Sequence, residues 1–350
     1  MSSLQSFVVQ HPVEDPESLL SPALVTYGDI LAEADAQVEA IPKAGQDAIV
    51  NDLRLLPGGS AANCAAIAAN LGATARFIGL VGQDAFGKML VQDLEQHGVD
   101  ISALRQVAGP TAVAIIIIDR TGERTFLSFR GAGASVPYGS LPASILRVGD
   151  CLHISGYTFQ TSHSRDTALG LMAVAREVGA AISVDPSFHF ARQVMDQYRH
   201  VLDSLDLFFP NKEEALLIAG TQDPANAAER LRNLGIKTVV LKLGADGCLI
   251  ATEAGISRIP AYSTPRVVDT TGAGDAFAGG FLAATMKGCP LEEAARVGHA
   301  AAAMIVAEVG GHTGAPTLSD LRDFAQDQRD ASLLAAITRL EPVTIRRGRH

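Results

Sequence analysis

The sequence predicts an α/β protein with a central, mostly parallel sheet, helices on both faces of that sheet, and a small β-sheet that forms a lid. Two observations predict this architecture. Short β-branched and apolar runs alternate with helical segments along most of the 350 residues, which is typical of a parallel sheet. The alternation is interrupted at 112–129, where two such runs flank a turn that contains a glycine.

Strands of the parallel sheet are expected where apolar runs have the length of a strand. These runs are 23–27, 75–81, 151–155, 180–184, 207–209 and 238–243. Helices are expected where apolar residues recur with helical spacing or where alanine predominates. They are 60–71, a segment within 82–98, 163–178, 212–219, 224–234, 274–287, 291–308 and 317–328.

An antiparallel hairpin is expected inside this parallel pattern. Residues 112–118 are a β-branched run, 119–123 form a turn, and 124–129 continue as a second strand. Residues 36–56 have an extended pattern as well, so the two segments are expected to form one small sheet beside the main domain. That sheet serves as a lid over an active-site cleft, or as an edge extension or dimer contact, and the roles can coexist.

The chain is expected to hold one large α/β domain with a lid rather than two domains, because no internal repeat or low-complexity linker divides it. The expected parts are an N-terminal tail at 1–21, a domain at 22–330 with its lid from about 36–56 and 110–130, and a C-terminal segment at 331–350.

Composition excludes several classes of function. The net charge of −10 argues against a partner made of nucleic acid, which would need a basic face. Four cysteines without C-x-x-C spacing favour reduced thiols in a cytoplasmic protein over a disulfide framework. The N-terminus lacks the pattern of a signal peptide, and apolar runs such as 112–118 are too short to span a membrane.

The most informative stretch is 267–277, VVDTTGAGDAF, where a glycine-rich turn opens a helix. The first turn of a helix has free N–H groups that favour an anion such as phosphate. Asp275 adds a negative charge there, which suits a base that takes a proton from a nucleophile. An ordinary first-turn acid is the structural alternative. A dinucleotide fingerprint is excluded because Phe277 replaces its third glycine.

The segment 269–277, DTTGAGDAF, resembles the C-terminal signature of the ribokinase-like (PfkB) family of carbohydrate and nucleoside kinases. The segment 57–63, PGGSAAN, resembles the N-terminal signature of the same family. The resemblance covers about 23–328 and implies a ribokinase-like fold with Asp275 as general base. It implies that the amides of Gly272, Ala273 and Gly274 form an anion hole, and that the acceptor contacts Gly58, Gly59 and Asn63.

On the acceptor side of the expected site, the sequence departs from the family pattern at one position, and one matching segment has a structural alternative. In the family, an Asp that binds acceptor hydroxyls follows the first strand's glycine by five residues, whereas here Gly28 plus five is Glu33. Asp29 and Asp35 are nearby candidates for the same role. The alternative for the 57–63 segment is that Ser60 caps the helix.

The resemblance implies a nucleotide site across 211–315. Asn211 and Glu214 match the family's N-x-x-E motif, in which the Glu acts on Mg²⁺ through water, although a capping box explains the pair as well. Lys242, Gly244 and Gly247 lie where the ATP tail passes, and a solvated lysine in a βα turn is the alternative. His299 matches a position beside the adenine, with a core histidine as its alternative.

Two further parts of the sequence resemble sites for an ion or a phosphate. Some relatives bind a monovalent cation, and the matching elements are Asp269, Thr271 and the loop 310–315. K⁺ is therefore a further candidate cofactor beside ATP and Mg²⁺. Residues 82–89 approach a P-loop, but Met89 stands where that motif needs a hydroxyl, so Lys88 is assigned to a helix surface.

The predicted function is ATP-dependent phosphorylation of a hydroxyl of a small sugar. A nucleoside kinase of the adenosine-kinase type is the second choice. A nucleobase needs an aromatic surface on which to stack, and few aromatic residues lie in the expected lid (Phe126, Phe129 and Tyr138). A non-catalytic nucleotide-binding protein is disfavoured by the intact GAGD sequence with Asp275. The expected partners are a small sugar or nucleoside and a second copy of the chain that contacts the lid.

Overall fold

The computed structural model describes residues 21–121, 123–131, 136–142, 144–264 and 266–341. Nearly all of the expected N-terminal tail, and the C-terminal segment beyond 341, therefore lie outside the described residues. Within them, no helix has the length and apolar character needed to cross a membrane.

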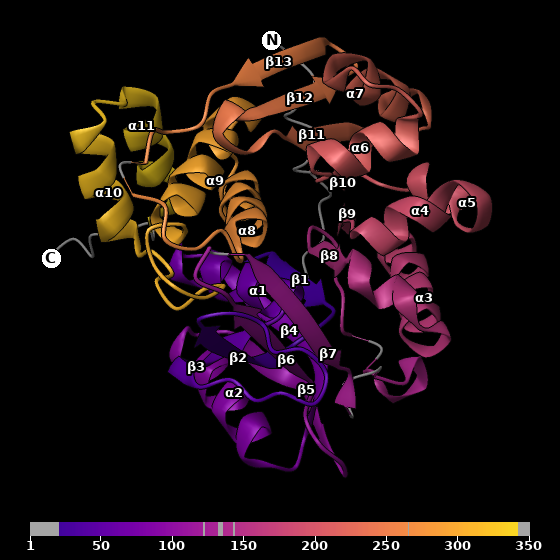
Figure 1. The fold of residues 1–350 in the computed structure, drawn as a ribbon. Helices are drawn as coiled ribbons and strands as arrows, with labels where there is room; N and C mark the ends of the chain where they lie inside the picture. Colours follow the sequence, from indigo (N-terminus) through magenta and orange to yellow (C-terminus); the bar gives the residue numbers. More distant parts are fainter. Residues whose placement is uncertain (1–20, 122, 132–135, 143, 265, 342–350) are drawn as a thin grey trace, which may run out of the picture.

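A nine-stranded sheet forms the centre of the molecule, in the order β13-β12-β11-β10-β9-β8-β1-β4-β5 (Figure 1). The seven strands from β11 to β5 pair in parallel, and β12 and β13 add antiparallel pairs at one edge. The strands are β1 (Ala23–Tyr27), β4 (Thr74–Gly82), β5 (Asp100–Val107), β8 (Cys151–Ser155), β9 (Ala181–Asp185), β10 (Leu207–Phe208), β11 (Thr238–Lys242), β12 (Cys248–Thr252) and β13 (Gly255–Ile259).

Helices cover both faces of this sheet because alternate strand residues point to opposite sides. Within β1, Leu24 packs in one core cluster with Ile67 of α1, whereas Val25 packs in another with Leu171 of α3. One face carries α1 (Ser60–Asn70), α2 (Ala85–Gln96), α8 (Ala273–Met286), α9 (Leu291–Ile305), α10 (Leu318–Asp327) and α11 (Ala331–Leu340). The other carries α3 (Ser162–Val178), α4 (Phe188–Gln197), α5 (Arg199–Leu202), α6 (Lys212–Ala219) and α7 (Pro224–Asn233).

A separate four-stranded sheet has the order β3-β2-β6-β7 and is made of β2 (Leu31–Val38), β3 (Val50–Gly58), β6 (Val113–Ile118) and β7 (Arg124–Phe129). β6 and β7 pair antiparallel and lie outside the central sheet. The expected α/β class with a smaller second sheet is therefore confirmed. Figure 1 shows this second sheet in the indigo and purple part of the chain, near α2.

The two faces of the small sheet differ in character. Leu55, Ala34, Ile115 and Leu127 stand side by side in one row across its four strands. Leu55, Ile115 and Leu127 of this row are 52%, 42% and 54% exposed. Glu33, one residue along β2, is on the opposite face and is buried. The face of Glu33 and Asp35 therefore holds buried carboxyl groups, whereas the apolar row on the other face is exposed to solvent.

The prediction from the sequence missed several helices and strands. Strands β5, β12 and β13 and helices α4, α5 and α11 had been assigned no secondary structure. β13 is a half-exposed edge strand, and its sequence GISRI lacks a continuous apolar run. The segment that begins at 331 starts as α11, whose Leu333, Ile337 and Leu340 are fully buried. Its packing makes α11 part of the same core as α8 and α9.

Candidate active site

The N-terminus of α8 is shaped by glycine. Gly272 is the N-cap residue and has a left-handed conformation with φ of 72°. A Cβ on Gly272 would lie only 2.2 Å from the carbonyl oxygen of Gly311, so a larger residue would collide with the 310–315 loop. No side chain among the described residues caps this helix, which leaves its first turn of amides suited to an anion.

Asp275 lies in this first turn and is held by two donors from α1. Ser60 Oγ donates to Asp275 Oδ1 at 2.8 Å, and Asn63 Nδ2 donates to Asp275 Oδ2 at 2.8 Å. Burial and the nearby charge of Asp185 raise the pKa of Asp275 to about 7, against the effect of the two donors. A carboxyl group with this pKa can accept a proton near neutral pH.

Lys242 and Asp185 form a buried pair next to this turn. Lys242 ends β11, Asp185 ends β9, and Lys242 Nζ lies 2.5 Å from Asp185 Oδ2. Lys242 Nζ is also 3.2 Å from the position that a Cβ on Gly274 would take. Burial opposes the charge of Lys242, but the carboxylates of Asp185 and Glu214 outweigh burial and raise its pKa. The solvated-lysine alternative is therefore wrong.

Asn211 and Glu214 form the capping box that opens α6. Asn211 Oδ1 accepts from the Glu214 amide at 2.9 Å, and Glu214 Oε2 accepts from the Asn211 amide at 2.9 Å. Glu214 is buried, which raises its pKa, while the charge of Lys242 opposes the rise. A backbone bridge between Asn211 and Lys242 places this cap beside the Lys242–Asp185 pair.

Asp29 and Glu33 meet the start of α1 from the other side. Asp29 Oδ2 accepts from the Ser60 amide at 3.0 Å, and Gly59 approaches the Asp29 backbone so closely that a Cβ would lie 2.5 Å from its carbonyl oxygen. Glu33 packs against Gly58 in the same way, with 2.3 Å from a Gly58 Cβ to Glu33 Oε1. Gly59 is the N-cap of α1, so the structural alternative of a Ser60 cap is wrong.

This side of the site is acidic. Burial raises the pKa of Glu33 to about 8, and the charge of Asp35 adds to the rise, followed by the charges of Asp275, Asp269 and Asp29. Asp29 Oδ1 and Glu33 Oε2 are buried and have no hydrogen-bond partner among the described residues. Such atoms suit the hydroxyl groups of a ligand.

Asp269 joins the turn before α8 to the 310–315 loop. Asp269 Oδ1 accepts from the Thr271 amide at 2.7 Å, and Asp269 Oδ2 accepts from the Gly310 amide at 3.1 Å. Asp269 is buried. The structure thus brings together the elements that the sequence assigned to a monovalent cation.

The remaining residues predicted to bind the nucleotide are Gly244, Gly247 and His299. Gly244 and Gly247 flank the single 3₁₀ turn after β11, and both have positive φ. Gly247 is also tightly packed, since a Cβ there would lie 2.0 Å from the Ile259 carbonyl oxygen. His299 is buried against Phe277, with ring centroids 4.8 Å apart, and burial lowers its pKa to about 4. Its surroundings are those of the core histidine that the sequence left as the alternative.

Three side chains near Asp275 were missed by sequence reasoning. Ser60 had been considered only as a cap, and Asp185 had been assigned no role although it ends a parallel strand, the usual position of ligand-binding residues. His312 lies in the 310–315 loop, and its Nδ1 is 2.6 Å from Asn63 Oδ1. No sequence signal connects His312 to Asn63, because 249 residues separate them.

Two pockets lie near these residues. One is lined by Tyr27, Asp29, Arg130, Tyr157, Gln160 and Thr161, among others, so it adjoins the acidic side of the site. The second lies between α9 and α10 and includes Thr313 and Gly314 of the 310–315 loop, but none of the other predicted site residues.

The comparisons with known proteins agree on one family. The model of the pfkB family of carbohydrate kinases matches residues 21–318. An uncharacterized sugar kinase of Archaeoglobus fulgidus is 32% identical over 250 residues, which are 71% of this chain and 98% of the relative. The ATP-dependent ribose-1-phosphate kinase of Halopiger xanaduensis is 31% identical over 310 residues, 88% of this chain and 99% of the relative.

A solved structure shows the same architecture. The ribokinase of Arabidopsis thaliana, complexed with ribose and ATP, superimposes with a TM-score of 0.76 at 26% identity and covers 91% of this chain and 99% of its own. The family match spans both glycine-rich turns and the strands and helices between them. The chain therefore belongs to the pfkB family of carbohydrate kinases.

Proposed function

We propose that this kinase transfers the γ-phosphoryl group of ATP to a hydroxyl of a small sugar, with Asp275 as the general base. The observation that carries the proposal is the placement of Asp275. Its carboxylate is oriented by Ser60 and Asn63 at the amide-rich start of α8, and its pKa is raised to about 7. A base with this pKa accepts the hydroxyl proton as the oxygen attacks phosphorus.

The acceptor is assigned to the acidic side of the site. Asp29, Glu33 and Asn63 surround the start of α1, and Glu33, with its pKa of about 8, is neutral at pH 7. A neutral carboxyl group both donates and accepts hydrogen bonds, as a sugar hydroxyl does. The small sheet that carries Glu33 then serves as the lid of the acceptor site.

The phosphates are assigned to the opposite side. The amides of residues 272–275 would hold the transferred phosphoryl group, and the ammonium of Lys242 beside Gly274 would balance its charge. Ribokinase-like kinases use ATP with Mg²⁺, which bridges and neutralises phosphate oxygens when it is bound. Buried Glu214 fits this ion through a water molecule, and Asp269 with the 310–315 loop fits K⁺.

The lid is also proposed as the contact between two copies of the chain. The apolar row of Leu55, Ala34, Ile115 and Leu127 crosses the whole sheet and faces away from the acidic residues. Phe129 of the same face is 53% exposed. A self-complementary apolar face of this kind suits an isologous dimer.

A screen of ATP consumption over sugars, phosphorylated sugars and nucleosides tests the acceptor. We expect turnover with a free sugar. Arg130 lines the pocket beside Asp29, and the relative from Halopiger xanaduensis is a ribose-1-phosphate kinase, so sugar phosphates belong in the screen. Tyr157 lines the same pocket and offers one aromatic surface to a base, which keeps a nucleoside acceptor as the second candidate. Absence of turnover with every acceptor would contradict the proposal.

A further inference from the structure

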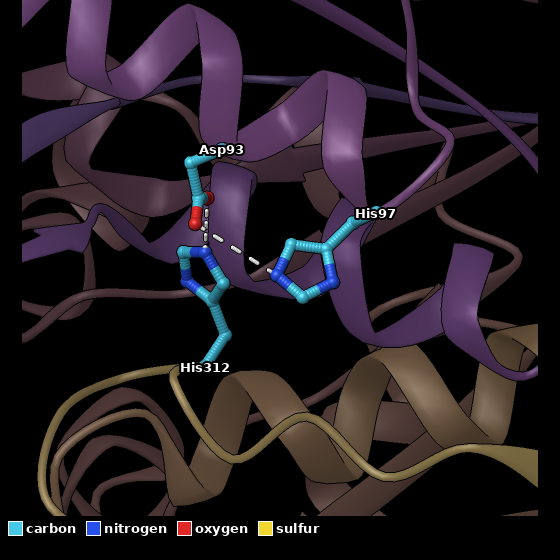
Figure 2. A group of neighbouring side chains, drawn as sticks. All are labelled: Asp93, His97 and His312. Carbon is cyan, nitrogen blue, oxygen red and sulfur yellow. Dashed lines mark hydrogen bonds and ion pairs between the residues drawn. The ribbon is translucent and has the colours of Figure 1, made fainter.

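A cluster of two histidines and one aspartate lies outside the residues assigned to phosphoryl transfer. Asp93 and His97 are one turn apart near the end of α2, and His312 reaches them from the 310–315 loop (Figure 2). Asp93 Oδ2 is 2.6 Å from His312 Nε2, and Asp93 Oδ1 is 3.8 Å from His97 Nε2. One ligand atom from each residue lies within 4.8 Å of the other two.

The tautomer of each histidine is fixed by an asparagine. Asn70 Nδ2 donates to the carbonyl oxygen of Ala315, so Asn70 Oδ1 is the atom that accepts from His97 Nδ1 at 3.0 Å. By the same reasoning, Asn63 Nδ2 donates to the carboxylate of Asp275, so Asn63 Oδ1 accepts from His312 Nδ1 at 2.6 Å. Both rings therefore carry hydrogen at Nδ1, and Nε2 is the atom that presents a lone pair in the neutral form of each ring.

The Nε2 atoms of both rings lie beside the carboxylate of Asp93. Three electron-rich groups repel one another unless a cation lies among them. A proton on His312 Nε2 forms a hydrogen bond only between His312 and Asp93. It makes no interaction with His97 Nε2. A metal ion satisfies all three groups, and histidines with their Nδ1–H groups held by an oxygen acceptor are typical of metal ligands.

We propose that Asp93, His97 and His312 bind a divalent metal ion of the zinc class. Two imidazoles and one carboxylate favour such an ion over Mg²⁺ or Ca²⁺, which prefer oxygen ligands. With metal–ligand bonds of about 2.1 Å, tetrahedral ligands lie about 3.4 Å apart. The distances of 2.6 Å and 3.8 Å lie on either side of that spacing, so small side-chain rotations complete the site.

The proposed metal site is accessible from solvent, and it is linked to Asp275 through Asn63. The side chains of Asp93 and His97 are 19% and 20% exposed, whereas that of His312 is 1% exposed, so the ion enters from the side of α2. His312 shares Asn63 with Asp275. An ion on His312 Nε2 strengthens its Nδ1–H as a donor and so holds the Asn63 amide with its nitrogen toward Asp275. The site thus goes beyond phosphoryl transfer and stabilises the position of Asn63.

Metal binding is measured on the full chain after treatment with a chelator, without nucleotide or acceptor. Zn²⁺ binding is followed by calorimetry, and Co²⁺ serves as the probe for visible absorption. We expect one ion per chain in the wild type and a higher melting temperature with Zn²⁺. His97→Gln removes a partly exposed ligand and is expected to weaken binding by at least about 100-fold, more than loss of an outer hydrogen-bond partner usually does.

Two further variants complete the test. His163→Gln removes an exposed histidine on α3 and is expected to leave Zn²⁺ binding unchanged. Asn70→Ala removes the acceptor of His97 Nδ1 and is expected to weaken binding by about 10–100-fold. If the wild type binds no Zn²⁺ or Co²⁺, or if His97→Gln binds them as tightly as His163→Gln, the proposal is wrong. Neither result depends on kinase activity, so both stand whatever the acceptor screen gives.

Discussion

Lys242 and Asp185 form a 2.5 Å ion pair across two strand ends, at the point where the start of α8 meets the sheet. Both side chains are mostly buried, at 15% and 8% exposure. Burial raises the pKa of Asp185 to about 7, although the charge of Lys242 opposes the rise. The pair therefore holds one ammonium close to Gly274 inside an environment that would otherwise exclude the charge.

Removal of Lys242 separates its structural role from its catalytic one. Lys242→Met leaves the buried Asp185 without its partner and is expected to lower the free energy of unfolding by about 1–3 kcal/mol, below the usual cost of breaking a buried pair because Asp185 can take a proton. Adding Asp185→Asn is expected to restore stability but leave turnover reduced by about 10²-fold or more. Denaturant unfolding and steady-state kinetics measure the two effects. Wild-type turnover in the double variant would limit Lys242 to a structural role.

Glu214 can be tested without disturbing its helix cap. Glu214→Gln keeps an oxygen that accepts from the Asn211 amide, so stability is expected to change by less than about 0.5 kcal/mol. Loss of the charge is expected to raise the Mg²⁺ concentration for half-maximal turnover by about 10-fold or more. Glu213→Gln, on the same turn but exposed, is the matched control. Equal Mg²⁺ dependence in both variants would mean that Glu214 serves only to cap α6.

The apolar face of the small sheet predicts the oligomeric state. Leu127→Lys places a charge at the β7 end of the row that joins Leu55, Ala34 and Ile115, and is expected to convert a dimer into a monomer. Leu217→Lys changes another exposed leucine, on α6, and is expected to leave the dimer intact. Light scattering on a sizing column measures both masses. A monomeric wild type would exclude the lid contact.

The cation site predicts a dependence on the monovalent salt. Asp269 fixes the 310–315 loop through the Gly310 amide, and glycines allow carbonyl groups of such a loop to turn inward. Turnover is therefore expected to rise when K⁺ replaces tetramethylammonium at constant ionic strength. The same initial rate in both salts, measured with saturating ATP and acceptor, would remove K⁺ from the proposed cofactors.

The sequence predicted the parts of the site that are local in the chain. The turn at 272–275 and the 211–214 cap each lie within a few consecutive residues, so spacing and residue type were sufficient. The βα alternation predicted most of the parallel strands for the same reason. The edge strands β5 and β13 were missed because edge strands need no continuous apolar run.

Contacts between distant segments could not be read from one sequence. Asp185, Ser60 and His312 reach the Asp275 region from three different parts of the chain, and only the order of the strands brings them together. The role of Ser60 was missed because its residue type is typical of a helix cap, whereas Gly59 takes the cap position and releases the hydroxyl toward Asp275.

The pKa of Asp275 predicts opposite effects of pH on turnover and on stability. The folded pKa of about 7 lies above the ordinary value of 3.8, so between these values the folded state binds more protons than the unfolded state. Stability conferred by this group therefore falls as pH rises through that range, by at most about 1.4 kcal/mol per pH unit. Turnover should rise over the upper part of the same range, because only the ionised carboxylate accepts a proton.

Asp275→Asn tests the base and the pH effect together. The amide keeps the size of the side chain and can still accept from Ser60, although its NH₂ group then faces the donor Asn63 Nδ2. It cannot take the hydroxyl proton. Turnover in a single-turnover experiment is therefore expected to fall by about 10²–10⁴-fold. The variant also lacks the buried ionisation, so its melting temperature relative to that of the wild type should rise from pH 5 to pH 8. ATP binding should hold or tighten, because a negative charge beside the phosphate position is lost.

A structural Asp275 predicts the reverse: lower stability, with near-normal transfer per folded molecule. Near-normal transfer by the folded variant would exclude Asp275 as the general base.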